Sequence, residues 1–267
     1  MKRPKSTAST SSEDRVEQYI RAAAAGDVKR VRQLLDACVD VNAFFKGANA
    51  LIFASKEGHA RVVRLLLERG ADPSTKSRTG KYAGNSFPLH ALALAAEQGH
   101  LEIVQMLIRA GAEVNHSIAF DRDALCAAAT GGHTEVVREL LAAGHQIEDG
   151  VGLKALRAAV NWSSNQGAAL LLIKAGVKVD GEAGANLLQT AAGFHMVSTV
   201  KALLDAGVDP TLKNHFGRSA LAGLNWHRRH EVATKGREKN PRASERIRQL
   251  VANAVASQRR RRRDARS

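Results

Sequence analysis

The sequence of 267 residues contains few of the residues that build disulfide frameworks or structural metal sites. Its two cysteines, Cys38 and Cys126, lie 88 positions apart, and neither has a C-x-x-C partner. We therefore expect neither a disulfide framework nor a structural zinc site. Because each cysteine is found in an alanine-rich stretch with a helical pattern, both are predicted to be small buried hydrophobic residues.

Aromatic residues are also scarce, at 4% of the chain, although 44% of all residues are hydrophobic. A core of alanine and leucine favours stacked helices, because small side chains let helices approach closely. No run of 18 apolar residues is present, so no membrane-spanning helix is expected. The basic N-terminus has no following apolar segment and does not resemble a secretory signal peptide. We expect a cytoplasmic monomer, with the nucleus or export as an effector without such a peptide as alternatives.

The sequence motifs of several enzyme classes are absent. The chain has no G-x-S-x-G, P-loop, H-E-x-x-H or dinucleotide-binding fingerprint. A nucleophile with an adjacent base, or two isolated carboxylates, would be needed for catalysis, and neither pattern is visible. The sequence therefore predicts a protein that is not an enzyme and that needs no cofactor or metal.

The net charge of +14 is concentrated at the two ends of the chain. Residues 1–12 contribute +3, whereas residues 13–226 are nearly neutral, with 23 basic and 22 acidic side chains. Residues 227–258 and residues 259–267 contribute +5 each. The body of the protein is thus balanced, and most of the basic excess lies at the C-terminal end.

Three segments repeat one pattern, in which a Gly-His pair is followed by apolar residues and a second glycine. The pairs are Gly58-His59, Gly99-His100 and Gly132-His133, and weaker copies flank them. Each copy predicts a short helix that ends at a left-handed glycine, a second helix with apolar residues at helical spacing, and a turn. The glycines after the second helices lie 33, 32 and 31 positions apart, at Gly111, Gly144, Gly176 and Gly207. One such hairpin cannot bury its apolar face, so the copies are expected to stack.

This pattern resembles the ankyrin family, whose repeats read G-x-T-P-L-H-x-A-A-x-x-G-H-x-x-I-V-x-x-L-L-x-x-G-A-D-x-N. The resemblance covers residues 13–226 and implies an all-α solenoid of six to seven helix-turn-helix repeats with projecting β-turns. The expected repeats are residues 13–44, 45–83, 84–118, 119–150, 151–181, 182–214 and 215–258. Disordered segments are expected on both sides, basic in residues 1–12 and Arg-rich in residues 259–267.

Several positions depart from the family pattern. Phe87-Pro88-Leu89-His90 looks like the T-P-L-H opening, but the spacing to Gly99 makes Leu92 the counterpart of the pattern's leucine. An insertion of about eight residues is predicted between Lys76 and Phe87, where Gly, Ser and Lys are frequent. Ser164-Asn165 and His195-Met196 replace Gly-His in the fifth and sixth repeats. These changes indicate either relaxed stacking or a specialised surface in the C-terminal half.

The histidines are interpreted as structural. His59, His100 and His133 follow glycine at a helix boundary, where the side chain is expected to hydrogen-bond to the backbone. His227 and His230 are three positions apart and could share a helix face. A metal site would need further ligands, and the sequence offers no clear third one.

Aromatic and basic residues in the predicted projecting turns are candidates for partner binding, because ankyrin proteins generally bind partners with these tips and with the first helices on the concave side. Exposed aromatic side chains beside basic ones suit recognition, although a phenylalanine at the base of a turn can instead pack between repeats. The candidates are Phe44, Phe45, Lys46, Lys76, Arg78, Lys81, Tyr82, Phe120, Asp121, Arg122, His215, Phe216 and Arg218.

A second candidate surface is a row of aromatic residues. Trp162, Phe194 and Trp226 are each 32 positions apart, at the end of the first helix in the last three repeats. Equal spacing predicts a stripe on the concave face that could bind a peptide or stacked bases. The alternative is local packing that compensates for the lost Gly-His turns.

The arginine run Arg259, Arg260, Arg261, Arg262 and Arg263, with Arg266, is not expected to fold alone. Three interpretations compete for it: phosphate binding to DNA or RNA, a nuclear-localisation signal, and a solubilising end without a specific role. The leading hypothesis is a non-enzymatic module that binds a protein partner through repeat tips and concave face, as an inhibitor, effector or adaptor. The alternative is a nucleic-acid-associated regulator that uses the basic last repeat and the arginine run.

Overall fold

The computed structural model describes residues 12–77, 89–115, 123–148, 150–161, 166–214, 217–222, 224–225 and 240–265. The chain divides into two compact units, Met1–Ala127 and Ala128–Ser267. These are called the N-terminal unit and the C-terminal unit, and each is described by itself. Helix α7 (Ala124–Gly131) contains the boundary.

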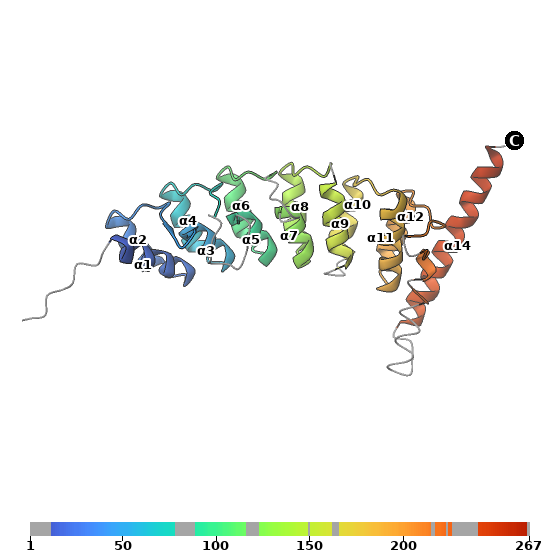
Figure 1. The fold of residues 1–267 in the computed structure, drawn as a ribbon, viewed down its shortest axis with the longest axis horizontal. Helices are drawn as coiled ribbons and strands as arrows, with labels where there is room; N and C mark the ends of the chain where they lie inside the picture. Colours follow the sequence, from blue (N-terminus) through green and yellow to red (C-terminus); the bar gives the residue numbers. More distant parts are fainter. Residues whose placement is uncertain are drawn as a thin grey trace, which may run out of the picture. The chain divides into compact units, whose positions relative to one another are not determined.

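The N-terminal unit consists of helical hairpins arranged in two layers (Figure 1). The first helices of successive hairpins, α1, α3 and α5, pack against one another, and the second helices, α2, α4 and α6, do the same. These helices are α1 (Ser12–Ala24), α2 (Val28–Asp36), α3 (Ala50–Lys56), α4 (Ala60–Glu68), α5 (Ala91–Gln98) and α6 (Leu101–Arg109). The unit therefore has the repeat architecture that the sequence predicts.

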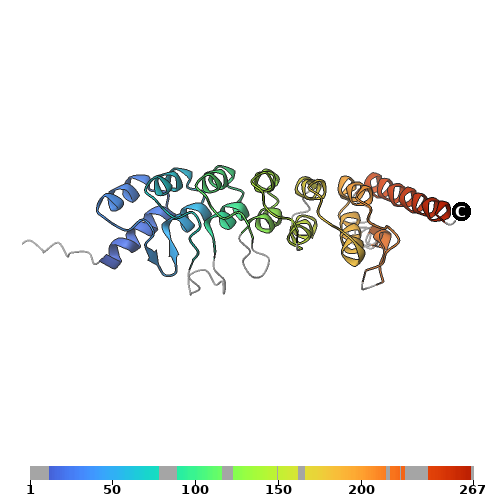
Figure 2. The same ribbon diagram turned by 90° about the horizontal axis from the view of Figure 1, so that it is seen from above.

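A short antiparallel β-hairpin separates the first two helical hairpins. Strand β1 (Phe44–Phe45) pairs with β2 (Ala48–Asn49), with Phe45 opposite Ala48. The two strands project from the helices of the N-terminal unit (Figure 2). The hairpin is thus one of the projecting turns expected for this fold.

The C-terminal unit continues the pattern of paired helices. In this unit α8, α10 and α12 pack in succession, α9 packs on α10 and α11, and α12 packs on α14. These helices are α8 (Thr134–Ala142), α9 (Val151–Asn161), α10 (Gln166–Lys174), α11 (Gly181–Gly193), α12 (Val197–Asp205) and α14 (Pro241–Asp264). At 11 and 13 residues, α9 and α11 are longer than α3 and α5, because each begins soon after the preceding turn.

The core is built from small and branched aliphatic side chains. Each second helix buries a leucine on the face that meets its neighbours, and each such side chain contributes about 2 kcal/mol by burial. These residues are Leu34, Leu66, Leu107, Leu140, Leu172 and Leu203. In the first helices, Leu51, Leu92 and Leu125 are buried at equivalent positions, because each is the second residue of its helix. Leu92 is therefore the counterpart of the pattern's leucine, as the spacing predicts.

Glycines end most of the helices in the left-handed conformation, as predicted. Gly58 and Gly99 have φ values of 81° and 78° at the ends of first helices. The cysteine prediction is only half right. Cys126 is buried in α7, but Cys38 is exposed and has a φ of 62° after α2, where other repeats have glycine. The alanine-rich context of Cys38 gave no sign of this, because the residue lies just beyond its helix.

The prediction of a disordered tail from residue 259 is wrong for residues 259–264. Helix α14 begins at Pro241, where Asn240 accepts a hydrogen bond from the Ala243 backbone, and continues for 24 residues to Asp264. Ile247 and Val251 anchor its first half in the core. The arginines then extend an existing helix, which requires no new nucleation, and cations near a helix C-terminus are favoured by the helix dipole.

Candidate protein-interaction surface

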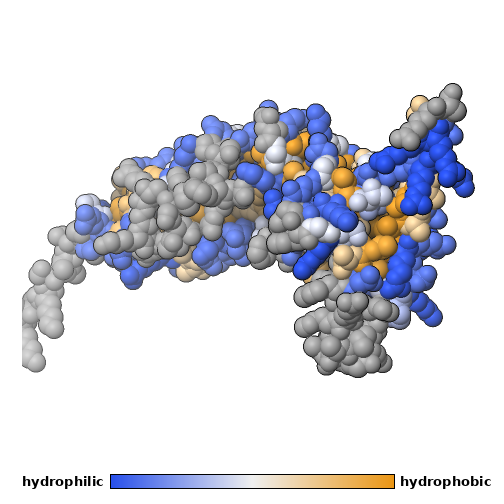
Figure 3. Space-filling model, turned by 45° about the vertical axis from the view of Figure 1, so that its right-hand side comes forward, coloured by the Kyte–Doolittle hydropathy of each residue, from blue (hydrophilic) through white to orange (hydrophobic). Residues whose placement is uncertain are grey.

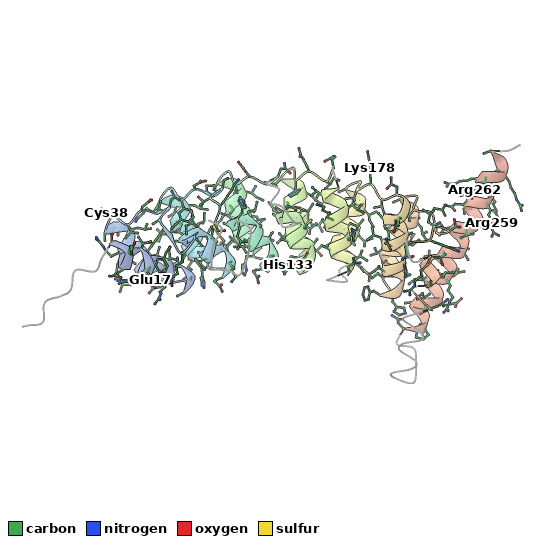
Figure 4. The ribbon with its side chains drawn as sticks, viewed as in Figure 1. Glu17, Cys38, His133, Lys178, Arg259 and Arg262 are labelled. Atoms are coloured by element: carbon green, nitrogen blue, oxygen red, sulfur yellow. The ribbon has the colours of Figure 1, made fainter. Side chains whose placement is uncertain are left out.

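Histidines join successive repeats of the N-terminal unit. The His59 Nε2 lies 2.9 Å from the carbonyl oxygen of Ala24, at the end of α1. The His100 Nε2 lies 3.2 Å from the carbonyl oxygen of Lys56, at the end of α3. Each side chain thus bonds to the backbone of the preceding repeat, as the sequence predicts. His133 has the same position between α7 and α8 (Figure 4).

The tip of the β-hairpin carries three of the predicted partner-binding residues. Phe44 and Phe45 are half-buried and Lys46 is exposed. Lys46 and Gly47 form a two-residue loop with positive φ values of 50° and 91°, the backbone that matches the twist of paired strands. The Lys46 Nζ lies 5.0 Å from the centre of the Phe45 ring. The tip therefore presents an aromatic ring and a cation together.

The hairpin is held firmly at its base. The Asn49 Oδ1 accepts a hydrogen bond of 2.9 Å from the Ile52 backbone, so the residue that ends β2 also caps α3. Such a cap stabilises a helix by about 1 kcal/mol. Because the strand and the helix share this residue, the tip has a fixed orientation relative to α3.

The ends of the predicted insertion meet at a small bridge. Lys76 and His90 form an isolated antiparallel β-bridge, and the Ser77 backbone N–H donates to the Leu89 carbonyl at 2.8 Å. The Leu89 N–H in turn donates to the Ser77 hydroxyl at 2.6 Å. Lys76 is exposed beside this bridge. The described residues on both sides of the predicted insertion are therefore joined next to α5, within the same unit as the β-hairpin.

In the C-terminal unit, Phe194 is the described member of the predicted aromatic row. It is the C-cap residue of α11 and its side chain is 42% exposed, which is high for a phenylalanine. His195 follows with a φ of 57° and so has the left-handed conformation of the family's glycine. Met196, which takes the place of the family's histidine, is buried. The position of Phe194 at the end of a first helix agrees with the sequence prediction.

Of the other predicted partner-binding residues, Arg218 is described and exposed, next to Asn214, whose side chain accepts a hydrogen bond from the Arg218 backbone. The predicted partner-binding residues outside the described ranges are Arg78, Lys81, Tyr82, Phe120, Asp121, Arg122, Trp162, His215, Phe216 and Trp226. His227 and His230, the histidines weighed as metal ligands, also lie outside these ranges. The stripe that would join Trp162, Phe194 and Trp226 stays a prediction.

The arginine run forms the last turns of α14. Arg259, Arg260, Arg261, Arg262 and Arg263 are all exposed, and Figure 4 labels Arg259 and Arg262. Successive helical residues point about 100° apart, so these side chains surround the helix. Arg262 lies 3.5 Å from a carboxylate oxygen of Asp209.

Asp209 has several polar partners in addition to Arg262. Desolvation alone would raise the pKa of Asp209. Hydrogen bonds from the side chain and backbone of Thr211 and from Gln258, together with the charge of Arg262, outweigh that effect and lower the pKa below its usual value. The end of α14 is thus attached to the turn that follows α12.

Sequence reasoning missed a groove between α12 and α14. Its volume is about 430 Å³, and its floor includes Leu204, Val208, Leu250 and Ala254. Figure 3 shows apolar surface near the hydrophilic C-terminal end of the chain. An amphipathic helix over residues 243–257 follows from the apolar spacing, but the spacing does not show how far this helix lies from α12, and the arginine run is predicted as a separate disordered tail.

Within the described ranges, no three His, Cys, Asp or Glu side chains are grouped closely enough to hold a metal ion. None of the helices in the described part of the chain is both long and apolar enough to cross a membrane.

Comparisons with known proteins agree with this architecture. The crystal structure of the human ASB11 ankyrin repeat domain is similar with a TM-score of 0.67 at 22% identity, and the match covers 87% of this chain and 96% of that one. The protein named "Ankyrin repeat, SAM and basic leucine zipper domain-containing protein 1" is 38% identical over 63 residues in Homo sapiens and 36% identical in Mus musculus. Each of these matches covers 23% of this chain, which spans only 13% of the length of these curated relatives.

The family model described as "Ankyrin repeats (3 copies)" matches residues 13–77 and 92–214, more than half of the chain. Its match includes α1 to α4 and most of the helices up to α12. Ankyrin repeats are generally protein–protein interaction modules and are typically not enzymes. On this match, the chain belongs to the ankyrin-repeat family.

Proposed function

We propose that this protein binds a protein partner through the tips of its repeats and the exposed ends of its first helices, as an inhibitor, effector or adaptor. The observation that supports this most directly is the β-hairpin tip, where Phe45 and Lys46 lie together on a loop anchored to α3. A rigid aromatic residue contributes a large contact area and loses little conformational entropy on binding.

A second observation supports the same kind of partner in the C-terminal unit. Phe194 is 42% exposed at the end of α11, and burial of this side chain by a partner would remove apolar surface from water. In the N-terminal unit, His59 and His100 bond to the backbone of the preceding repeat, and neither histidine belongs to the β-hairpin tip.

The experiment is an affinity capture from extracts of the source cells, with quantitative mass spectrometry of the recovered proteins. Phe45→Ala/Lys46→Ala and Phe194→Ala are compared with the wild type and with Lys178→Ala. Lys178 is exposed after α10 and is the matched surface control (Figure 4). We expect recovery of the partner to fall by about tenfold or more in at least one of the first two variants.

The proposal fails if the recovered proteins are the same for all four chains. Each variant is checked by circular dichroism, so that a loss of binding is not confused with a loss of folding. Lys178→Ala should retain full recovery, because the side chain lies away from the β-hairpin in sequence and outside the ends of the first helices.

A further inference from the structure

The groove between α12 and α14 is a formed surface, because the two helices are joined on both sides of it. Near the start of both helices, the His195 Nε2 lies 3.0 Å from the buried Ser244 hydroxyl. Near their far ends, Arg262 and Gln258 contact Asp209. The groove floor lies between these two connections, so its width is set by the fold.

The walls of the groove follow the periodicity of the two helices. On α14 the lining residues are spaced by three or four positions and therefore share one face. They are Leu250, Asn253, Ala254, Ser257, Gln258 and Arg261. From Leu250 to Arg261 this face is about 16 Å long, which matches about three turns of a bound helix.

The charge around the groove is predominantly positive. Lys201 and Arg261 line it, and the remaining arginines of the run 259–263 surround the adjacent turns of α14. Asp205 is the acidic residue of the lining, and Asp209 is paired with Arg262. A segment that enters the groove must therefore match an apolar floor and a basic rim.

From these features we infer that the groove binds an acidic amphipathic segment of a protein partner. Apolar side chains of the segment contact Leu204, Val208 and Leu250, and its carboxylates face Lys201 and Arg261. This is the helix-in-groove mode of recognition with a charged rim. The inference rests on the proposed function, since it assigns part of a protein partner to a surface distinct from the repeat tips.

Two other occupants fit the groove less well. A nucleic acid would place phosphates beside Asp205 and would gain nothing from an apolar floor. A second copy of this chain would bring together two chains that each carry a net charge of +14. The acidic segment is the occupant whose charge and apolar surface both complement the groove.

The test measures fluorescence anisotropy of a labelled peptide of about 14 residues, with leucines at i, i+3, i+4 and i+7 spacing and glutamates at the other positions. A peptide of the same composition in scrambled order, and one with lysines in place of glutamates, are the ligand controls. A DNA duplex is the nucleic-acid probe. The protein is the full chain at two salt concentrations.

The protein variants are a matched pair two residues apart on α14. Ala254→Glu adds a carboxylate to the groove floor, whereas Ala252→Glu adds the same charge at an exposed position on the opposite side of the helix. We expect Ala254→Glu to weaken binding of the acidic peptide by about tenfold or more and Ala252→Glu by less than about threefold. High salt should weaken binding to the wild type.

Several results would overturn the inference. Equal effects of the two variants would show that only the net charge of α14 matters. Equal binding of the scrambled or lysine peptides would remove the amphipathic or the acidic requirement. If DNA bound more tightly than the peptide, and both variants weakened DNA binding equally, the arginine run would be a phosphate-binding site instead. Loss of partner recovery by Phe45→Ala/Lys46→Ala, with no effect of Ala254→Glu on peptide binding, would preserve the proposed function and reject this inference.

Discussion

The second repeat, in the N-terminal unit, and the sixth repeat, in the C-terminal unit, form the same turn with different side chains. In the N-terminal unit, Gly58 has the left-handed conformation and His59 bonds back to Ala24 in the preceding repeat. In the C-terminal unit, His195 itself has the left-handed conformation, with a φ of 57°, and bonds forward to Ser244. Met196 fills the position of the family's histidine as a buried apolar residue. The backbone path is thus retained while the hydrogen bond changes direction and partner.

The comparison shows that the divergence of the C-terminal half is a local rearrangement that retains stacking. Val200 and Leu203 are as well buried in α12 as Val63 and Leu66 are in α4. The substitution of His195-Met196 for Gly-His therefore leaves the apolar face intact. It also lets the imidazole of His195 bond to Ser244 and so attach α14. Helix α14 has no counterpart among the described residues of the N-terminal unit.

The largest effect should come from Gly58→Ala in the N-terminal unit. A Cβ at this position would lie 2.6 Å from the His100 ring, and the φ of 81° disfavours any side chain. We expect a loss of about 3 kcal/mol in the free energy of unfolding, measured by urea titration with circular dichroism. Gly70→Ala, with a φ of 83° and no atom within 4 Å, should lose only about 1 kcal/mol. Similar losses for both variants would mean that the clash with the His100 ring adds nothing to the cost of the Gly58→Ala substitution.

The next largest effect should come from Ser244→Ala in the C-terminal unit. The Ser244 hydroxyl is fully buried and bonds to His195, so its removal leaves a part-buried imidazole without this partner. A loss of about 1–2 kcal/mol is expected. Tryptophan fluorescence suits the measurement, because both tryptophans, Trp162 and Trp226, belong to the C-terminal unit. A change below about 0.3 kcal/mol would show that the bond between His195 and Ser244 does not help to hold α14.

Replacement by glycine should act differently in the two units. Cys38 is exposed with a φ of 62°, so Cys38→Gly relieves backbone strain and loses little contact. We expect the free energy of unfolding to rise by about 0.5 kcal/mol. His195→Gly relieves similar strain but removes the bond to Ser244, so it should be neutral or destabilising. Stabilisation by both substitutions would contradict the structural role of His195.

The smallest effect should come from the pH dependence of Asp209. Because its pKa is lowered in the folded protein, the ionised carboxylate stabilises the fold above the ordinary value of 3.8, and this contribution is lost as the pH falls through the lower folded value. Asp209→Asn should therefore cost a few tenths of a kcal/mol at pH 7 and nothing at the acid end. Urea unfolding at several pH values between 7 and 3, followed by the tryptophan fluorescence of the C-terminal unit, measures the difference in stability between the two proteins. If the difference in unfolding free energy between the wild type and Asp209→Asn grew towards low pH, the prediction would be contradicted.

Much of the fold follows from local patterns in the sequence. The repeated glycines require a left-handed backbone, and the apolar spacing of the second helices identifies residues such as Leu66 and Leu107 as core. The spacing identifies Leu92, and not Leu89, as the counterpart of the family's leucine, because helix length fixes the distance from this leucine to the glycine that ends the helix. The histidine joints also follow, since His59 and His100, at the start of second helices, lie next to the preceding repeat.

Features that depend on tertiary context were not predictable. Arginines in a run repel one another, and α14 continues to Asp264 because Ile247 and Val251 anchor its first half and Arg262 pairs with Asp209. The groove requires the distance between two helices that are 36 residues apart in sequence, which no local pattern contains. The sequence left open whether Phe194 is exposed or packs locally, because its contacts depend on the neighbouring repeat; the structure shows it exposed at the end of α11.

The direction of the histidine bonds has a consequence for how the number of repeats can change. In the N-terminal unit, His59 and His100 each bond to a carbonyl at the end of the preceding repeat's first helix, so a repeat of this kind can be deleted or duplicated and the same bond can form again. At the sixth repeat the imidazole of His195 is committed to Ser244. A duplicated repeat can therefore form the same histidine bond within the N-terminal unit. At the sixth repeat it cannot, because His195 already bonds to Ser244 of α14.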